Sequence, residues 1–453
     1  MSGTNSSGVS VVVQNGEHWL RNYGDLAMMT VTVERLRQRW PEARIRMLTS
    51  APSLLRAYFP TVEPLADNGS LDLCGRLSPI NRLPELAGLG LVGPLSIGVL
   101  TARDPLYATL RRVRDGVRGA RRRPPVTGPD PDIDLADAPA SPAVLPAGVA
   151  AACREASLVL AMGGGYMTDT DPAATRQTLE MLEIAADRGI PTAMVGQGLG
   201  PMEDADLLAR AARVLPRVGF VATREGRFGP ELLNRVGYPA VDTLVSGDDA
   251  IELAYAERQV GLGRHIGLCL RIAEYSPVAQ RARSEVSGAV RAVAADNGAA
   301  LAPLMISEIR SEDRRSTLPL VAGYPDRVAP QPRFGTARGL ARRVSACRVV
   351  VTGAYHLAVF ALSQGIPVVA LSSTAYYTQK FVGLDEMFPG GLITVGLDAD
   401  DLTERLGEAL RDAWRRAPDV REPLRERARA QIGTSTEAFE RVFGLVDRVV
   451  TGT

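Results

Sequence analysis

Lys380 and His356 are the side chains in this sequence best suited to chemistry on a charged small molecule. Lys380 is the single lysine, and every other basic side chain is an arginine. Guanidinium meets nearly any surface need for positive charge, so a lone ammonium indicates a compact charge or a titratable amine that arginine cannot replace. His356 follows the buried strand 348–352 and begins a short helix, where the positive helix end favours a neutral ring that accepts a proton.

We therefore predict that His356 acts as a general base or acid and that Lys380 supplies a specific charge near it. The alternatives are an accident of composition for the lysine and a capping or packing role for the histidine.

The other histidines and the nearby carboxylates indicate no metal site. His18 lies in the first loop, His265 opens a strand, and no metal-ligand spacing links the three histidines. Asp385 and Glu386 are the only carboxylates between residues 347 and 395. Adjacent carboxylates point apart on a helix or strand, so surface solvation is the favoured interpretation. We expect neither a metal nor a cofactor.

Two arginines follow strands and could hold an anion. Arg224 comes directly after a strand that ends at Thr223, where a guanidinium can fork onto a carboxylate or phosphate. A surface ion pair with Glu225 is the alternative. Arg271 and the stretch 247–250 lie at strand ends in the same way.

Three glycine-rich turns follow strands in the first half of the chain. Glycine lets the backbone approach a ligand, and amides at a helix start can bind an anion. None of the turns matches the dinucleotide fingerprint or the P-loop, and a tight turn without a ligand is the alternative for each. Parallel strands would gather all three along one sheet edge, which favours a shared site. The turns contain Asn22, Gly24 and Asp25; Gly163, Gly164 and Gly165; and Gly196, Gln197 and Gly198.

The elements that must position these residues alternate between strand and helix. A β-branched run at 9–14 is followed by a polar loop, and Asp25 can cap an amphipathic helix that runs from Leu26 to about Trp40. A second strand follows at 44–49. This β-α-β order feeds a parallel sheet.

The alternation continues and predicts an α/β fold of two Rossmann-like domains whose parallel sheets face a central cleft. We place the first domain at 1–255 and the second at 256–453, where the last fifty residues form a helical tail. The pattern fails at about 103–146, which is rich first in arginine and then in proline and alanine, and we interpret it as an excursion.

Composition indicates an ordinary globular protein and argues against a nucleic-acid partner. The chain has 453 residues, 45% of them hydrophobic, and a formal net charge of +1, so no overall field gathers nucleic acid or an anionic membrane. No run is long enough for a transmembrane segment. The four cysteines lie far apart, which fits core thiols in a reducing compartment, and we expect a cytoplasmic protein.

An ordered set of motifs spreads over most of the chain. It comprises the three glycine-rich turns, Arg224-Glu225, Asp248 or Asp249 before Ala250, and the helix of His356 followed by the run 361–368. In this order the motifs resemble the polysaccharide pyruvyl transferase family, which usually has Arg-Asp where this chain has Arg224-Glu225.

The resemblance implies two domains of the glycosyltransferase-B shape and the transfer of an enolpyruvyl unit from phosphoenolpyruvate to a sugar, usually as a ketal. It implies that Arg224 holds this anionic donor, that His356 serves in proton transfer and that Lys380 faces the phosphate. The acceptor would be a sugar, a glycoconjugate or a natural product, and a homo-oligomer is compatible with the sequence. Three tyrosines near the predicted cleft could contact the acceptor, although packing is their commoner use: Tyr166, Tyr376 and Tyr377.

One departure from the family pattern bears on the donor. The family commonly has Arg-Leu-His at the helix start, whereas this chain has the run 354–356 with alanine first. Losing one buried charge-assisted contact of about 1.5–3 kcal/mol would weaken donor binding at least tenfold. Either Arg271, Arg342 or Arg343 substitutes for the missing arginine, or the donor has changed.

Two other functions therefore remain open. The first is a glycosyltransferase that uses a nucleotide sugar, in which Asp385 and Glu386 would have to hold the ribose. The second is a family member that binds a sugar, a lipid-linked intermediate or a natural product without turnover.

Overall fold

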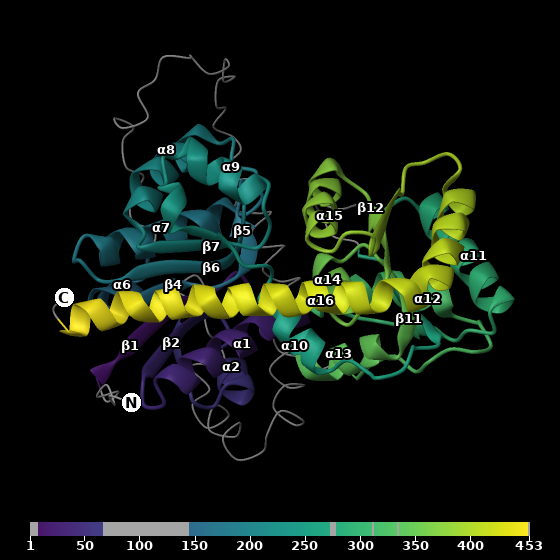
Figure 1. The fold of residues 1–453 in the computed structure, drawn as a ribbon, viewed down its shortest axis with the longest axis horizontal. Coiled ribbons are helices and arrows are strands. Elements are labelled where there is room, and N and C mark those ends of the chain that lie inside the picture. The colour runs from purple at the N-terminus through teal and green to yellow at the C-terminus, as the bar shows by residue number, and fades with distance from the viewer. Residues whose placement is uncertain (1–7, 67–144, 272–277, 310–311, 333–334, 452–453) are drawn as a thin grey trace, which may run out of the picture.

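The structure is a computed structural model, and the residues that it describes are 8–66, 145–271, 278–309, 312–332 and 335–451. Within them the chain forms two parallel β-sheets covered by helices (Figure 1), which confirms the predicted α/β fold. Apart from its last two positions, the predicted excursion at 103–146 lies outside the described residues. No helix in the described part of the chain is long and apolar enough to cross a membrane.

The first sheet has eight strands, and all the strand pairs recorded in it are parallel. Its order is β3-β2-β1-β4-β6-β7-β8, and β5 pairs with β6. The order reverses between β1 and β4, and sheets of this kind bind ligands beyond the carboxyl ends of the strands at such a reversal. The strands are β1 (Ser10–Gln14), β2 (Arg44–Thr49), β3 (Glu63–Ala66), β4 (Leu158–Ala161), β5 (Gly164–Met167), β6 (Thr192–Leu199), β7 (Phe220–Thr223) and β8 (Thr243–Val245).

The second sheet has five parallel strands in the order β10-β9-β11-β12-β13. Here the order reverses between β9 and β11, so a ligand site is expected beyond those two strands. The strands are β9 (His265–Cys269), β10 (Leu301–Pro303), β11 (Cys347–Thr352), β12 (Val368–Ser372) and β13 (Leu392–Gly396).

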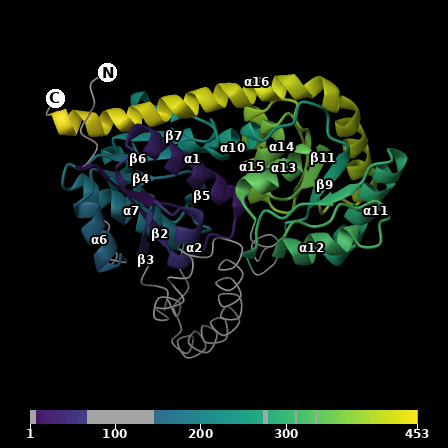
Figure 2. The ribbon, with the colours of Figure 1, turned by 90° about the horizontal axis from the view of Figure 1, so that it is seen from below.

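Helices cover both faces of each sheet (Figure 2). The described helices associated with the first sheet are α1 (Tyr23–Arg39), α2 (Pro52–Tyr58), α6 (Ala147–Arg154), α7 (Pro172–Ala186), α8 (Ala205–Val214), α9 (Phe228–Arg235) and α10 (Ala250–Ala256). The others are α11 (Gln280–Asp296), α12 (Glu312–Val321), α13 (Ala337–Ser345), α14 (Tyr355–Ser363), α15 (Ala375–Met387) and α16 (Leu402–Thr451), and short 3-10 helices occupy Leu215–Arg217 and Ala240–Asp242.

Three apolar clusters hold these layers together. One packs α6 to α9 on the outer face of the first sheet, and another packs α11, α12 and the start of α16 on the outer face of the second. The largest is continuous across both sheets. Val11 and Val13 of β1 face this shared core and Val12 faces the outer cluster, as the alternation of a strand requires. The shared core fastens the two halves of the molecule to each other.

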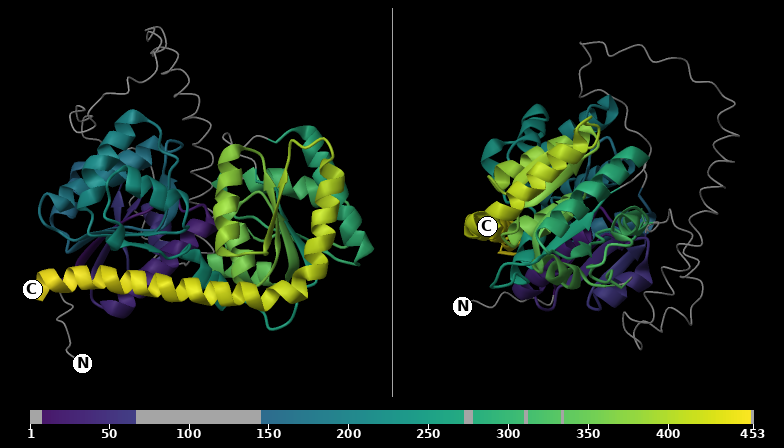
Figure 3. Two further views of the ribbon diagram at one scale, coloured as in Figure 1. Left: turned by 45° about the horizontal axis from the view of Figure 1, so that its top comes forward. Right: turned by 90° about the vertical axis from the view of Figure 1, so that its right-hand side faces the viewer.

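The helix α16 is a second connection between the halves. It bends beside the second sheet and then runs along the whole first half (Figure 3). Pro418 and Pro423 lie inside it, and a proline in a helix removes a backbone hydrogen bond and favours a bend. Ser435 of α16 accepts a hydrogen bond of 2.8 Å from Arg35 Nη1 and donates one of 2.7 Å to Asp249 Oδ1. The predicted helical tail therefore braces the first sheet as well as the second.

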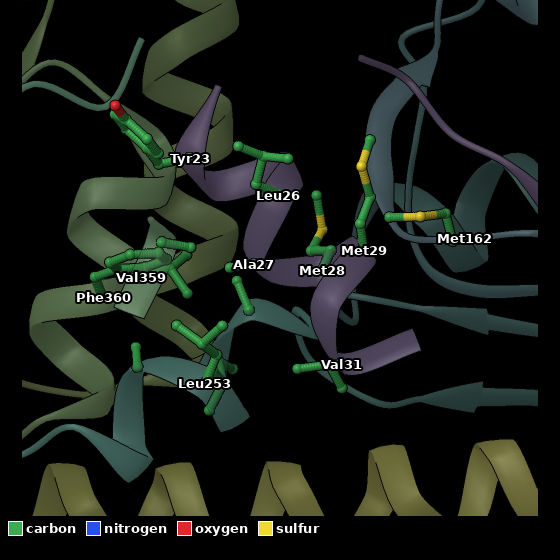
Figure 4. Packing of buried hydrophobic residues seen from close by; sticks show 14 of the residues in the cluster. Tyr23, Leu26, Ala27, Met28, Met29, Val31, Met162, Leu253, Val359 and Phe360 are labelled. Carbon is green, nitrogen blue, oxygen red and sulfur yellow. The ribbon is translucent and has the colours of Figure 1, made fainter. Parts of the chain in front are cut away.

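Helix α10 packs against both α1 and α14, and this arrangement of three helices positions the site. Figure 4 shows side chains of α1, among them Leu26 and Ala27, facing Leu253 of α10 and Val359 and Phe360 of α14. The first turns of α1 and α14 are thereby brought side by side, although they lie far apart in the sequence.

Some predicted boundaries were wrong, and two of the errors matter for the site. Helix α1 begins at Tyr23 and is capped by Asn22, whose side chain accepts a hydrogen bond of 2.9 Å from the Gly24 amide. Asp25 therefore lies inside the first turn and does not cap the helix. The predicted turn 196–198 is the end of β6, and 164–165 open β5, because the two strands pair with each other there.

The predicted division between residues 255 and 256 falls in the last turn of α10, next to the connection that leads to β9. It stays a prediction.

Candidate active site

A cavity of ≈ 260 Å³ is lined by residues that follow strands of both sheets. The first sheet contributes Gly16 and Glu17 after β1 and Arg224 after β7. The second contributes Arg271 after β9 and His356 after β11. The strands β1, β9 and β11 flank the two reversals of strand order, where parallel sheets place their ligands.

The ring of His356 is held between α1 and Asp248. Its Nε2 lies 3.6 Å from Asp248 Oδ2, and the side chain is 12% exposed. The backbone of Gly24 abuts the ring on another side, because a Cβ at that position would lie 2.3 Å from Nδ1. Glycine in the first turn of α1 is what allows the two helix starts to meet.

Asp248, in the connection between β8 and α10, links His356 to Arg224. Its Oδ2 is 3.8 Å from Arg224 Nη1, and its side chain is 1% exposed. Burial alone would raise the pKa of Asp248, but the imidazole of His356 and the guanidinium of Arg224 outweigh it and hold the pKa below its ordinary value. An ionised carboxylate behind a histidine orients the ring and stabilises its protonated form.

Arg224 lies between glycines and a tyrosine ring. Its Cζ is 4.3 Å from the ring centroid of Tyr355, a cation–π distance. A Cβ on Gly198 would be 2.5 Å from the guanidinium carbon, and one on Gly165 would be 3.0 Å from Nη2. These two glycines therefore make room for the cation.

Lys380 lies in α15, on the side of the second sheet, and its side chain reaches the surroundings of Arg224. Its Nζ is 3.3 Å from the position that a Cβ on Gly165 would take, and the side chain is partly buried in the cavity wall. Burial, together with the neighbouring charge of Arg224, lowers the pKa of Lys380 well below its ordinary value. The structure thus brings Lys380, Arg224 and His356 to one cavity.

Three carboxyl groups also line this cavity, those of Glu17, Asp25 and Asp171. Burial, and next the charge of Asp25, raise the pKa of Glu17 to about 7. Burial also raises the pKa of Asp25, although the charge of His356 opposes the change. Because Asn22 caps α1, the carboxylate of Asp25 is left facing the cavity. Sequence reasoning assigned Glu17 no role, and its place directly after β1 was the available signal.

Not all of the predicted glycine-turn residues reach the cavity. Gly165 lines it, as do Asn22 and Asp25, and Gly24 lies behind His356. Gly198 makes room for Arg224 and lines a second cavity, and the other members serve packing. Gln197 is fully buried and donates its amide to the carbonyls of Ala161 and Met162 and to the hydroxyl of Tyr166.

Gly163 and Gly196 make room for a buried carboxylate instead of a ligand. A Cβ on Gly196 would lie 2.6 Å from Asp249 Oδ2, and one on Gly163 would lie 3.3 Å from it. Gly164 turns its backbone at φ +156, where a Cβ would strike the ring of Tyr166. These three glycines therefore allow the strands and loops of the first sheet to pack closely against buried side chains.

Arg271 is the one of the three candidate substitute arginines that lines the cavity. Its Nη1 lies 3.0 Å from Asp313 Oδ1 and 3.4 Å from Glu312 Oε2, so its position is fixed by α12. Arg342 pairs with Glu257, and Arg343 donates to a backbone carbonyl of the loop before α13. Neither of them lines the cavity.

The tyrosines differ in their surroundings. Tyr166 is buried and lines the cavity, and its hydroxyl donates to the carbonyl of Met162 at 2.7 Å. Tyr377 is 7% exposed and also lines the cavity. The side chain of Tyr376 lies outside the described residues. Tyr355, which was not among the predicted site residues, lines both this cavity and a second one.

Asp385 and Glu386 are remote from the cavity lining. Glu386 is exposed and pairs with Arg227 at 3.3 Å, and both carboxylates lie on α15 beyond Lys380. The part of the chain that the structure describes contains no cluster of three or more histidine, cysteine or acidic side chains arranged to hold a metal ion.

The sequence matches the family model for polysaccharide pyruvyl transferases over residues 22–374. The chain belongs to this family. It is a family of transferases, so the predicted class of enzyme is confirmed. A search of curated proteins found no match to the sequence.

The fold of this pyruvyl transferase family member is similar to that of solved enzymes of the glycosyltransferase-B shape. A putative UDP-N-acetylglucosamine 2-epimerase from Listeria monocytogenes is 15% identical with a TM-score of 0.55, covering 98% of this chain and 97% of its own. A UDP-glucosyltransferase from Polygonum tinctorium is 11% identical with a TM-score of 0.52, covering 98% and 100%. At these identities the likeness shows the fold alone, and it confirms the predicted pair of Rossmann-like units.

The raised pKa of Glu17 predicts a pH dependence of stability in this family member. A carboxyl with a folded pKa of about 7 and an unfolded value near 4.5 favours folding fully below 4.5 and loses this effect as pH rises through 7. At about 1.4 kcal/mol per pKa unit, the wild type should lose about 3 kcal/mol over this window relative to Glu17→Gln. Urea unfolding on both sides of the window measures it. Glu404→Gln, at an exposed position of α16, should follow the wild type, and equal slopes for wild type and Glu17→Gln would contradict the prediction.

Proposed function

We propose that this protein transfers an enolpyruvyl or pyruvyl unit from phosphoenolpyruvate to hydroxyl groups of a sugar or glycoconjugate. The observation that carries the proposal is the convergence of Arg224, Lys380 and Arg271 with the His356–Asp248 pair on one cavity. Membership of the family supports the same reaction.

The cations of the cavity match the charge of the donor. Phosphoenolpyruvate carries about three negative charges, on a phosphate and a carboxylate. Arg224 and Lys380 lie together at Gly165 and form the phosphate end, while Arg271 stands in for the arginine that is absent at Ala354. We therefore expect the donor to be unchanged in spite of the missing residue.

The acidic wall is compatible with an anionic donor because burial raises the pKa of its carboxyl groups and so favours their neutral forms. With a pKa of about 7, Glu17 is about half protonated at neutral pH, and burial raises the pKa of Asp25 as well. Ionisation of Glu17 above pH 7 would repel the donor, so donor affinity should fall there.

The reaction assigns a role to each group. The methylene carbon of phosphoenolpyruvate takes a proton, and positive charge develops on the neighbouring carbon. An acceptor hydroxyl oxygen then forms a bond to that carbon and loses its proton, while the phosphate leaves with the electron pair of its C–O bond. The departure of phosphate leaves positive charge on that carbon, and a second hydroxyl of the same sugar adds to it and loses its proton, which closes a ketal. His356, which lies beside Asp248, relays the proton, and Lys380 and Arg224 stabilise the departing phosphate.

Incubation with phosphoenolpyruvate and simple glycosides tests the function. We expect phosphate release that requires both substrates, a product heavier than the glycoside by one pyruvyl unit, and a rise in Tm with phosphoenolpyruvate alone. Stabilisation by UDP-glucose with transfer of its sugar would show instead that the protein is a nucleotide-sugar glycosyltransferase. Binding without turnover would indicate a non-catalytic member.

Gly198→Ala is expected to weaken donor use by displacing Arg224. The new methyl group would lie 2.5 Å from the guanidinium carbon, and the side chain can move away because its far end is flexible. Losing that charge-assisted contact should lower kcat/KM for phosphoenolpyruvate by tenfold or more, at about 1.5–3 kcal/mol, with a small change in Tm. Gly288→Ala in α11, where a Cβ meets nothing within 4 Å, is the matched control and should keep wild-type kinetics. Unchanged donor kinetics in Gly198→Ala would remove Arg224 from the donor site.

A further inference from the structure

A second cavity of ≈ 230 Å³ lies next to the first and shares part of its wall. Arg224, Tyr355 and Lys380 line both cavities. A molecule bound in the second cavity would therefore lie next to a molecule bound in the first. Elements of both halves form it, with β6 and α9 on one side and α15 on the other.

Away from the shared wall, the lining of the second cavity includes a group of apolar side chains beside its charged and polar ones. Leu199, Met202 and Leu232 are all less than 5% exposed and belong to the outer apolar cluster of the first sheet. Phe228, at the start of α9, is partly buried, and Pro201 lies at the rim. A surface of this kind favours an uncharged apolar group.

Two of the three glutamates of this cavity are engaged in the fold, whereas the third, Glu231, is exposed in the first turn of α9. Glu225 accepts hydrogen bonds of 2.8–3.0 Å from the amides of Arg227, Phe228 and Gly229, so its carboxylate caps α9. Glu203 pairs with Arg235 at 3.0 Å. Apart from that paired arginine, the cations in this described lining are the two of the shared wall.

The charged groups of the two cavities indicate which cavity binds the donor and which binds the acceptor. Each cavity has three acidic side chains in its lining, but the first adds Arg271 and His356 to the shared cations, whereas the second adds only Arg235, which is paired with Glu203. A donor with about three negative charges is therefore stabilised better in the first cavity than in the second. The second cavity is left for the other substrate.

We propose that the second cavity binds an uncharged apolar group, such as an aryl or alkyl aglycone, that is attached to the acceptor sugar. This inference rests on the proposed function, because it takes the sugar hydroxyls to lie at the shared wall. The apolar group packs against Phe228 and Leu232, and the attached sugar reaches the donor past Tyr355 and Lys380.

Calorimetric binding of paired glycosides tests the cavity independently of turnover. The probes are the methyl and 4-nitrophenyl glycosides of glucose and of galactose, titrated in the presence of phosphoenolpyruvate. We expect the aryl member of a pair to bind at least tenfold more tightly than the methyl member. Equal affinities within both pairs, or no binding of any probe, would overturn the inference.

Two variants at one position connect the preference to the cavity. Phe228→Ser removes the aromatic wall, and Phe228→Glu adds a charge that the first turn of a helix tolerates. Both should reduce the aryl preference to less than threefold while leaving the methyl glycosides unaffected. Val241→Ser, at a residue 82% exposed, is the control for loss of an apolar side chain and should keep the preference. An aryl preference that survives both variants would refute the assignment.

Phosphate release from phosphoenolpyruvate distinguishes failure of this inference from failure of the proposed function. Turnover of methyl and aryl glycosides with equal KM would overturn the apolar subsite and leave the function standing. Preferential aryl binding that is lost in Phe228→Glu, without any phosphate release, would support the subsite and overturn the function.

Discussion

His356→Ala is expected to lower turnover by at least about two orders of magnitude without unfolding the protein. General acid–base catalysis by a positioned side chain contributes about 10²–10⁴ in rate, and this ring lies between Gly24 and Asp248 with its side chain 12% exposed. The kcat for pyruvyl transfer measures the effect, and Tm reports the fold. Because the donor cations are untouched, KM for phosphoenolpyruvate should change little.

Two further variants test whether the effect is specific to His356: Asp248→Asn changes its partner, and His265→Ala is a control. Asp248→Asn keeps the shape beside His356 but removes the carboxylate charge next to the ring, so it should also lower kcat. His265 opens β9 and lies outside the lining of both cavities, so its alanine variant should turn over like the wild type. Wild-type turnover in His356→Ala would exclude the histidine from the mechanism.

Lys380→Met should lower kcat/KM for phosphoenolpyruvate by about 10- to 150-fold, the effect of losing one charge-assisted contact of about 1.5–3 kcal/mol. Lys380→Arg should not restore it. The Nζ lies 3.3 Å from the place that a Cβ on Gly165 would take, and Arg224 Nη2 lies 3.0 Å from the same point. A second, larger guanidinium cannot take the place of the compact ammonium there.

The same lysine predicts a pH effect on donor binding. Because burial and Arg224 lower the pKa of Lys380 well below its ordinary value, the amine loses its proton as pH rises through that lowered pKa, and affinity for the anionic donor falls with it. Arg227→Lys, on the surface beside Glu386, is the control for an arginine–lysine exchange and should leave kinetics unchanged. Donor kinetics in Lys380→Arg that equal those of the wild type would remove the special role of this lysine.

Local patterns in the sequence predicted the strands and the helix starts well. The runs at 44–49 and 348–352 are strands within one residue of the structure, because buried parallel strands require continuous β-branched and apolar residues. The helix start at His356 was also readable, since a strand, a short turn and an apolar helix follow one another there.

The glycine turns show where sequence reasoning failed. Gly163, Gly196 and Gly198 look alike in the sequence, yet the first two face the buried Asp249 and the third makes room for Arg224. A glycine marks a close approach of some kind, but its neighbour comes from another part of the chain. Asp25 was misread for a related reason, because two polar residues three positions apart are both suited to cap a helix, and the structure has Asn22 as the cap of α1.

By itself the sequence determined the alternation of strand and helix, the family and the two unusual side chains at 356 and 380, because these depend on residues close together along the chain. The tertiary structure alone decided that Asp248 stands behind His356, that Arg271 and not Arg342 reaches the cavity, and that Tyr355 lines two neighbouring cavities. These facts depend on the packing of α1 and α14 across α10 and on how the two sheets meet. The order of residues along the chain does not show which distant residues lie close together in space.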